Sequence, residues 1–149
     1  MIKTYYEVNY VIFFRYDEVD KENVEDRRFI GYFSSKKKAT DAIQQCLKFD
    51  NVAESNFEII KRRVSFEEEP KVLYQVSHEY TIEVAGDLFV DYSYIFPPKA
   101  TLEEAEKLYE SLRKKKKYKK SENRIYTMYP PDGFWIDELE IDVFCFGGL

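Results

Sequence analysis

Hydrophobic and polar residues alternate along the first part of the chain, residues 5–16. Apolar side chains recur at every second position, so they fall on one face of an extended strand. These positions are Tyr6, Val8, Tyr10, Ile12, Phe14 and Tyr16. The polar run DEVDKENVEDRR, residues 17–28, predicts a long hairpin loop, and the apolar segment RFIGYF, residues 28–33, predicts a short second strand.

The apolar spacing then changes to that of a helix. Ser35 can cap a helix that begins at Lys36, because its hydroxyl can accept a hydrogen bond from a free backbone N–H in the first turn. The predicted buried stripe of this helix consists of Ala39, Ala42, Ile43, Cys46 and Leu47. The segment NFEIIKRRVSF, residues 56–66, predicts another strand, and EEEP, residues 67–70, predicts a junction.

The second half of the chain repeats this order. Residues 71–84 and 88–96 alternate as strands, and the prolines of PPKAT, residues 97–101, end the second one. Thr101 and Glu104 form a capping-box pattern at the start of a helix. The apolar stripe of that helix consists of Ala105, Leu108, Tyr109 and Leu112. The segment FWIDELEIDVFCF, residues 134–146, predicts the closing strand.

Aligning the two caps, Ser35 on Thr101, aligns the apolar stripes of the two helices, and the closing strands match each other separately. Ala39 then falls on Ala105 and Cys46 on Leu112, while the closing strands match with Phe57 on Phe134, Ile59 on Ile136 and Val64 on Ile141. The predicted fold class is therefore α+β, with two tandem ββαβ modules of mainly antiparallel sheet and a helix on one face of each. The predicted modules are residues 1–69 and 70–149. We expect them to bury surface against each other. One possible arrangement joins their strands into a single sheet of about six, with both helices on the same side.

The segments FIGYFSSKKKATDAI and NFEIIKRRV resemble a small bacterial domain family of uncharacterised function. In that pattern a strand ending IG-Y/F-S-S leads into a helix with K-A-x-x-A-I, followed by a strand of the type GF-x-I with a later aspartate. DGFWIDELEID, residues 132–142, fits this last part, which is consistent with two divergent copies. The resemblance implies a fold unit, and it supplies no catalytic residues.

Composition and charge limit the possible functions. No long apolar segment or signal-peptide pattern is present, and Cys46 and Cys145 lack a CxxC spacing. We therefore expect a cytoplasmic protein with reduced thiols, and a single disulfide bond between the two cysteines is the alternative. Basic residues number 23 and acidic residues 28. Seven of the basic residues lie in RKKKKYKK, residues 113–120, which leaves 16 basic against 28 acidic residues elsewhere, a balance of −12.

The basic run is one candidate site. Its cations could follow a phosphate backbone while its tyrosine stacks on a base. The alternative is a solvated helix end, whose cations meet the negative end of the helix dipole. The candidate nucleic-acid contacts are Arg113, Lys114, Lys115, Lys116, Lys117, Tyr118, Lys119 and Lys120.

Acidic clusters are the other candidate. Charged residues beside an aromatic anchor are typical of a protein interface, and a solubilising surface is the alternative. The candidate interface residues are Trp135, Asp137, Glu138, Glu140 and Asp142. His78, the only histidine, alternates with Val76 and Tyr80, which favours a partly buried position. The common phosphate-binding, nucleophile and zinc motifs are absent from the sequence, so we expect no cofactor.

These observations favour a non-enzymatic protein that binds another protein with a basic surface, for example an immunity protein that neutralises a toxin. A nucleic-acid-associated protein is the alternative. An enzyme with a site between the modules has less support. Strand edges rich in tyrosine could pair between chains, so a monomer or a homodimer is expected.

Overall fold

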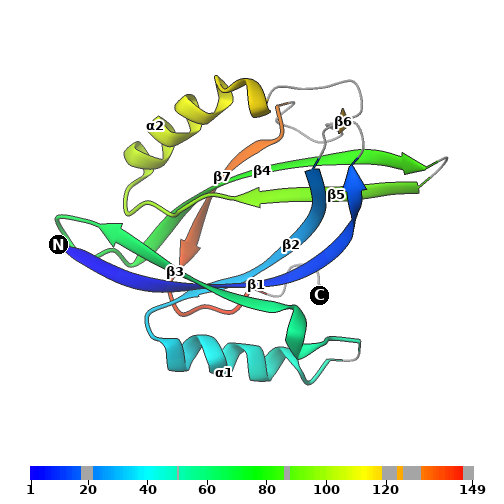
Figure 1. Cartoon of the computed structure of the whole chain (residues 1–149). Helices are drawn as coiled ribbons and strands as arrows, with labels where there is room; N and C mark the ends of the chain where they lie inside the picture. The colour runs from blue at the N-terminus through cyan, green and yellow to red at the C-terminus, as the bar shows by residue number, and fades with distance from the viewer. Residues whose placement is uncertain (18–21, 50, 86–87, 119–123, 126–131, 146–149) are drawn as a thin grey trace.

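Two antiparallel sheets, each covered by one helix, make up the chain in a computed structural model (Figure 1). The structure describes residues 1–17, 22–49, 51–85, 88–118, 124–125 and 132–145. The first unit consists of β1 (Ile2–Asp17), β2 (Glu22–Phe33), α1 (Lys36–Cys46), η1 (Glu54–Asn56) and β3 (Phe57–Ser65). The second consists of β4 (Val72–Ala85), β5 (Leu88–Ile95), α2 (Leu102–Arg113), η2 (Lys116–Tyr118), β6 (Arg124–Ile125) and β7 (Phe134–Glu140). The predicted α+β fold class is confirmed.

The first strand of each unit lies in the middle of its sheet. The order of the first sheet is β2-β1-β3. In the second sheet β4 pairs with β5 on one side, and with β7 and the short β6 on the other. All of these pairings are antiparallel.

The predicted hairpin loop over residues 17–28 is wrong in most of its length. β1 continues to Asp17 and β2 begins at Glu22, so residues 22–28 belong to a strand. In the pairing with β1, Arg27 lies opposite Val11 and Arg28 opposite Tyr10. Because ladder hydrogen bonds join backbone groups, a polar segment can extend a strand when a long partner lies beside it.

Both predicted helix caps are confirmed. The Ser35 hydroxyl accepts a hydrogen bond from the Lys38 N–H at 3.2 Å. The Thr101 hydroxyl accepts one from the Glu104 N–H at 3.3 Å and donates to the Glu104 carboxylate at 3.2 Å. The predicted stripes also face the sheets. Their buried members are Ala39, Ala42, Ile43 and Cys46 in α1, with Ala105 and Leu112 in α2.

The two units repeat the same strand register. Tyr10 lies opposite Phe57 in the first sheet, as His78 lies opposite Phe134 in the second. On the other side of the central strand, Phe33 pairs with Tyr6. An isolated bridge between Lys99 and Tyr74 takes the same place in the second unit, beyond the prolines that end β5. The repeat therefore extends to the pairing of individual residues.

The two sheets stay separate, which differs from the single sheet of six strands considered from the sequence. They lie between the two helices, with α1 below the first sheet and α2 above the second (Figure 1). An apolar cluster without helical residues joins the inner faces. Its buried members are Tyr5, Tyr32, Val64, Leu73 and Ala100. The helices lie on opposite outer faces because each unit buries one sheet face under its own helix and the other against its neighbour.

A polar network lies beside this apolar cluster, between the two sheets. The Glu7 side chain is 0% exposed and accepts a hydrogen bond from Arg62 Nε at 3.0 Å. Asn9 donates to the same carboxylate at 2.6 Å. The Tyr32 hydroxyl accepts a bond from Gln75 of the second unit at 2.7 Å and donates to Glu7 at 3.4 Å. Burial and the neighbouring Glu7 charge raise the pKa of Tyr32 well above its usual value.

Two further bonds link the units along this network. Arg62 donates through its Nη2 atom to the Ile95 carbonyl at 3.4 Å, so one guanidinium joins both units. The Ser93 hydroxyl accepts from the Arg27 N–H at 3.3 Å and donates to the Arg27 carbonyl at 3.0 Å. Ser93 therefore satisfies both backbone groups of a residue at the edge of the first sheet.

The segment after β7 returns to the first sheet. Asp142 N–H donates to the Tyr32 carbonyl at 2.8 Å, and Cys145 N–H donates to the Ile30 carbonyl at 2.7 Å. The predicted closing strand therefore ends at Glu140, and residues 141–145 lie along the edge of β2. A side chain at Gly31 would approach the Val143 carbonyl to 2.8 Å, so the close fit of this segment depends on glycine.

We predict that replacing Arg62 destabilises the protein far more than replacing its neighbour Arg63. Arg62→Met leaves the buried Glu7 carboxylate without its cation, which costs about 3–5 kcal/mol. Arg63 is exposed on the same strand, so Arg63→Met changes the free energy of unfolding by less than about 0.5 kcal/mol. Urea unfolding measures both values. The double variant Arg62→Met/Glu7→Gln recovers part of the loss, and equal losses for the two single variants would contradict the buried pair.

Candidate functional site

Strand β7 forms an edge of the second sheet and carries most of the predicted interface residues. In the described part of the chain it pairs only with β4. Its alternate residues face opposite sides of the sheet. Phe134 and Ile136 pack under α2, and Glu138 and Glu140 follow on the same face. Trp135, Asp137 and Leu139 belong to the other face, which looks toward the first unit.

Three carboxylates are exposed along this strand. Asp137, Glu138 and Glu140 are all exposed, and Trp135 is half-buried. Partial burial raises the pKa of Asp137 above its usual value. Burial also raises the pKa of Cys145, and the nearby Asp137 charge adds to this effect. The free Cys145 therefore lies close to the acidic strand.

A second acidic cluster lies beside the first one. The turn Glu67–Glu69 is exposed and leads into β4. At the start of β4, Val72 pairs with Glu140, and the Ile141 N–H donates to the Lys71 carbonyl at 3.3 Å. The acidic junction and the acidic closing strand, far apart in the sequence, thus meet at one end of the second sheet. We call Asp137, Glu138 and Glu140 the acidic edge.

Asp142 serves a different purpose from the acidic edge. Its carboxylate accepts hydrogen bonds from the Ser34 N–H and the Ser34 hydroxyl, both at 2.7 Å, and from Lys38 Nζ at 3.0 Å. Burial alone would raise the pKa of Asp142, but the bonds from Ser34 and Lys38 outweigh it, so the pKa lies below its usual value. The predicted interface set is therefore divided: Asp142 connects the end of the chain to the start of α1.

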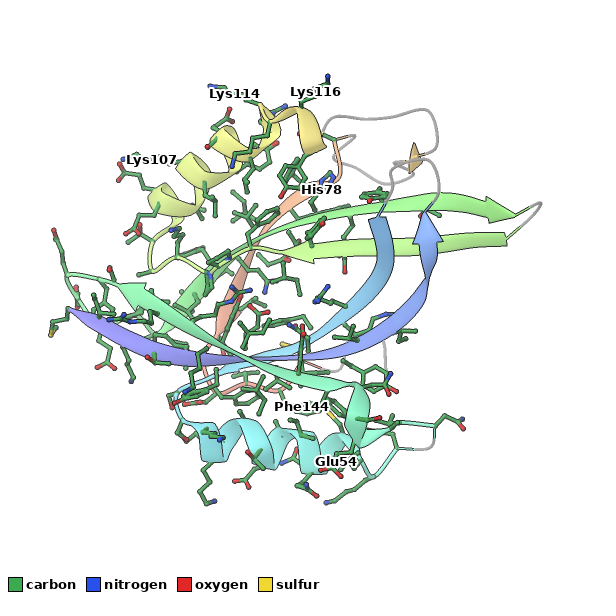
Figure 2. All side chains as sticks on the ribbon, in the orientation of Figure 1. Glu54, His78, Lys107, Lys114, Lys116 and Phe144 are labelled. Carbon is green, nitrogen blue, oxygen red and sulfur yellow. The ribbon has the colours of Figure 1, made fainter. Side chains whose placement is uncertain are left out.

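The basic run begins with a residue that is already engaged. Arg113 ends α2, where its guanidinium lies 3.3 Å from Asp132 and 3.6 Å from Glu110, and above the Tyr109 ring. Lys114 and Lys116 are exposed, and Figure 2 shows them pointing away from the sheets, as Lys107 does. Lys115 is exposed as well. The side chain of Lys117, and Lys119 and Lys120 altogether, lie outside the described residues.

Tyr118 packs into the core between α2 and the second sheet. Its ring centre lies 5.5 Å from those of His78 and Phe96, and 6.0 Å from that of Phe134. The half-buried ring thus contributes to an aromatic cluster. The run of basic residues gave no sign of this, because a tyrosine flanked by lysines is typical of a surface.

The histidine and the buried cysteine both belong to cores. His78 is 0% exposed, so it is buried more deeply than the partly buried position predicted from its strand alternation (Figure 2). Its ring lies 4.2 Å from that of Phe134. Cys46, the last residue of α1, is buried, and desolvation raises its pKa to about 11. Among the described residues, no group of three or more His, Cys, Asp or Glu side chains is placed to bind a metal ion.

Sequence reasoning missed the polar network between the sheets. Glu7 and Asn9 lie on the face of β1 opposite to the predicted apolar face, yet both are completely buried. The sequence signalled this burial only indirectly. If the two modules pack together, the sheet face that does not carry the helix must be covered by the other module. None of the helices in the described part of the chain is long and apolar enough to cross a bilayer.

No family model, curated protein or solved structure matches the chain. The resemblance to a small bacterial domain family thus stays a prediction.

We predict that Asp142→Asn lowers stability at neutral pH by about 1–2 kcal/mol, because three donors lose their charged acceptor. The folded pKa of Asp142 is lowered, so its contribution is complete above the unfolded pKa of about 3.9 and disappears as the pH falls through the folded value. The difference between wild type and variant in urea unfolding should therefore shrink as the pH falls below about 4. Glu140→Gln is the control, and a difference that stays constant at acid pH would contradict the assignment.

Proposed function

We propose that the chain is a non-enzymatic protein that binds a basic partner protein through the acidic edge. The observation that supports this proposal is the exposure of Asp137, Glu138 and Glu140 along one edge strand, next to the acidic turn Glu67–Glu69. Clustered charges of one sign accelerate encounter with a surface of opposite sign and align the two partners. An edge strand adds backbone donors and acceptors that a partner strand can pair with.

The positions of the reactive side chains favour binding over catalysis. A general base must reach a substrate proton, and a nucleophilic thiol must be accessible as a thiolate. His78 is enclosed by aromatic rings, and Cys46 is buried with a raised pKa. Both side chains are used in packing.

A neutralising role fits this surface. A cytoplasmic immunity protein must cover the active surface of a toxin, and many surfaces that act on nucleic acid are basic because they contact phosphates. The chain has a net charge of −5, and the acidic edge concentrates three negative charges within four residues. We therefore infer that the partner presents a cluster of lysine or arginine side chains to β7.

We predict that neutralising the acidic edge abolishes partner capture, whereas the same charge change elsewhere does not. The test variant is Asp137→Asn/Glu138→Gln/Glu140→Gln. The control is Glu54→Gln/Glu103→Gln/Glu106→Gln, whose three residues are exposed outside β7, with Glu54 beside α1 (Figure 2) and the other two on α2. Wild type and both variants serve as baits in extracts of the native cell, and captured proteins are quantified by mass spectrometry.

The expected result is one basic protein that wild type and control retain and that the test variant retains at least roughly tenfold less, corresponding to about 1.4 kcal/mol. Equal losses for both variants would show that net charge alone attracts the partner. Equal retention by all three baits would place the binding surface elsewhere. Either of these two results would overturn the proposal.

Nucleic-acid binding is a second candidate, favoured by three adjacent exposed lysines. Lys114, Lys115 and Lys116 have no ion pair within the described residues. Figure 2 shows Lys114 and Lys116 projecting from the end of α2. The first turn of α2 carries Glu103 and Glu104, and its end is basic. Acidic residues at the start and basic residues at the end of a helix both interact favourably with the helix dipole, so these lysines also have a structural role.

The salt dependence of binding to a labelled single-stranded RNA oligonucleotide tests this candidate. If the lysines contact phosphates, Lys114→Gln/Lys115→Gln/Lys116→Gln should weaken binding and lower the slope of log affinity against log salt by about 0.7 for each phosphate that the variant no longer neutralises. The control Lys36→Gln/Lys37→Gln/Lys48→Gln changes the same charge beside α1 and should keep the wild-type slope. Undetectable binding by wild type at low salt would dismiss nucleic acid as a ligand of this run.

A further inference from the structure

Equivalent positions in the two units carry opposite charges. Lys61 lies opposite Tyr6 in the first sheet, and Glu138 lies opposite Tyr74 in the second. Since Tyr6 and Tyr74 are equivalent in the repeated register, Lys61 and Glu138 are equivalent too. In the same way Arg63, opposite Thr4, matches Glu140, opposite Val72. One unit thus carries two cations where the other carries two anions. We call Lys61 and Arg63 the basic edge.

Both pairs of charges lie on open strands of their sheets. In the described part of the chain β3 pairs only with β1, and β7 pairs only with β4. All four side chains are exposed, and none makes an ion pair with another described residue. Edge strands present backbone groups that can pair with another strand. Each edge strand therefore presents backbone groups that can hydrogen-bond to another strand, together with charged side chains that form no ion pair with another described residue.

Antiparallel pairing of β3 with β7 of a second molecule would bring these charges together. A register with Lys61 opposite Glu140 also sets Arg63 opposite Glu138, and both pairs lie on the same face of the ladder. Directly opposite ion pairs stabilise antiparallel strands, and like charges destabilise them. Pairing of two β7 edges would oppose acids, and pairing of two β3 edges would oppose bases. The charges therefore favour the mixed pairing and disfavour the other two.

We propose that the acidic edge of one molecule binds the basic edge of a second copy of the same chain, so that β3 and β7 form a continuous ladder between them. This inference rests on the proposed use of β7 for protein binding and names the basic edge of a second copy as the surface that β7 binds. The interface is head-to-tail, since it joins different surfaces of the two copies. Such an interface leaves one acidic and one basic edge open in a pair of molecules, and it closes into a ring or extends further.

Sedimentation velocity across a range of protein concentrations and salt tests this self-association. Wild type should show a weight-average mass that rises toward at least twice the monomer mass at low salt and falls back at about 0.5 M salt. Lys61→Glu/Arg63→Glu makes both edges acidic, and Glu138→Lys/Glu140→Lys makes both basic. Each variant alone should remain monomeric. An equimolar mixture of the two should associate, because each then supplies the charge that the other lacks.

Association in the mixture also shows that both variants are folded. Lys114→Glu/Lys116→Glu is the matched control; it reverses two exposed charges outside the two edges and should associate as wild type does. Wild type that stays monomeric at low salt would overturn self-association. Association that survives both reversals would show that the copies meet through another surface, and it would overturn the edge pairing as well.

The same variants separate this inference from the proposed function. Lys61→Glu/Arg63→Glu removes the basic edge but keeps the acidic one, so as a bait it should still capture a different basic protein. If this bait captures a foreign protein and wild type stays monomeric in sedimentation, self-association is overturned and the proposed function is unaffected. The other outcome is that the two variants associate in the mixture while no foreign protein is captured through the acidic edge. That result overturns the proposal of a foreign partner and supports binding to a second copy.

Discussion

The pairing of Glu7 with Arg62 determines how the two units can pack. A completely buried carboxylate is costly unless a cation and further donors surround it. Arg62 supplies the cation and also reaches the Ile95 carbonyl of the second unit, so a single side chain satisfies the acid and joins the sheets. The polar network restricts the two sheets to arrangements that keep these bonds, whereas an all-apolar interface could slide at little cost.

The network also shows how two similar units came to differ. The repeated register makes Glu7 and Gln75 equivalent, and both contact the hydroxyl of Tyr32. A hydroxyl donates one hydrogen bond, so it can serve one carboxylate and must accept from the other partner. Two glutamates would compete for the single hydroxyl proton of Tyr32. An acid in one unit and an amide in the other satisfy the shared hydroxyl.

Local features could be predicted from the sequence because their causes lie within a few residues. The caps at Ser35 and Thr101, the buried stripes of both helices and the alternation around Val76 depend on neighbours along the chain. The repeat followed from the same patterns, since two copies show the same apolar spacing twice. The acidic edge was visible as a run of charges on a predicted strand.

Other features depend on partners that sequence spacing does not show. Glu7 and Asn9 alternate as an exposed polar face would, and only the neighbouring sheet buries them. Asp142 looked like a member of the acidic surface, but its donors Ser34 and Lys38 belong to the first unit, more than 100 residues earlier in the chain. Tyr118 lies within a charged run, and the aromatic rings that surround it belong to β4, β5 and β7 or the segments next to them.

The contact between Asp142 and Ser34 has a consequence for how the protein is made. A ribosome releases the first sheet and its helix long before it has synthesised the residues that complete them. Until residues 141–145 emerge, the nascent first unit lacks the backbone donors beside β2 and the carboxylate at the start of α1. Folding of the first unit is therefore completed only after residues 141–145 have been translated, and a chain that stops before them exposes an unpaired strand edge to other unfinished chains.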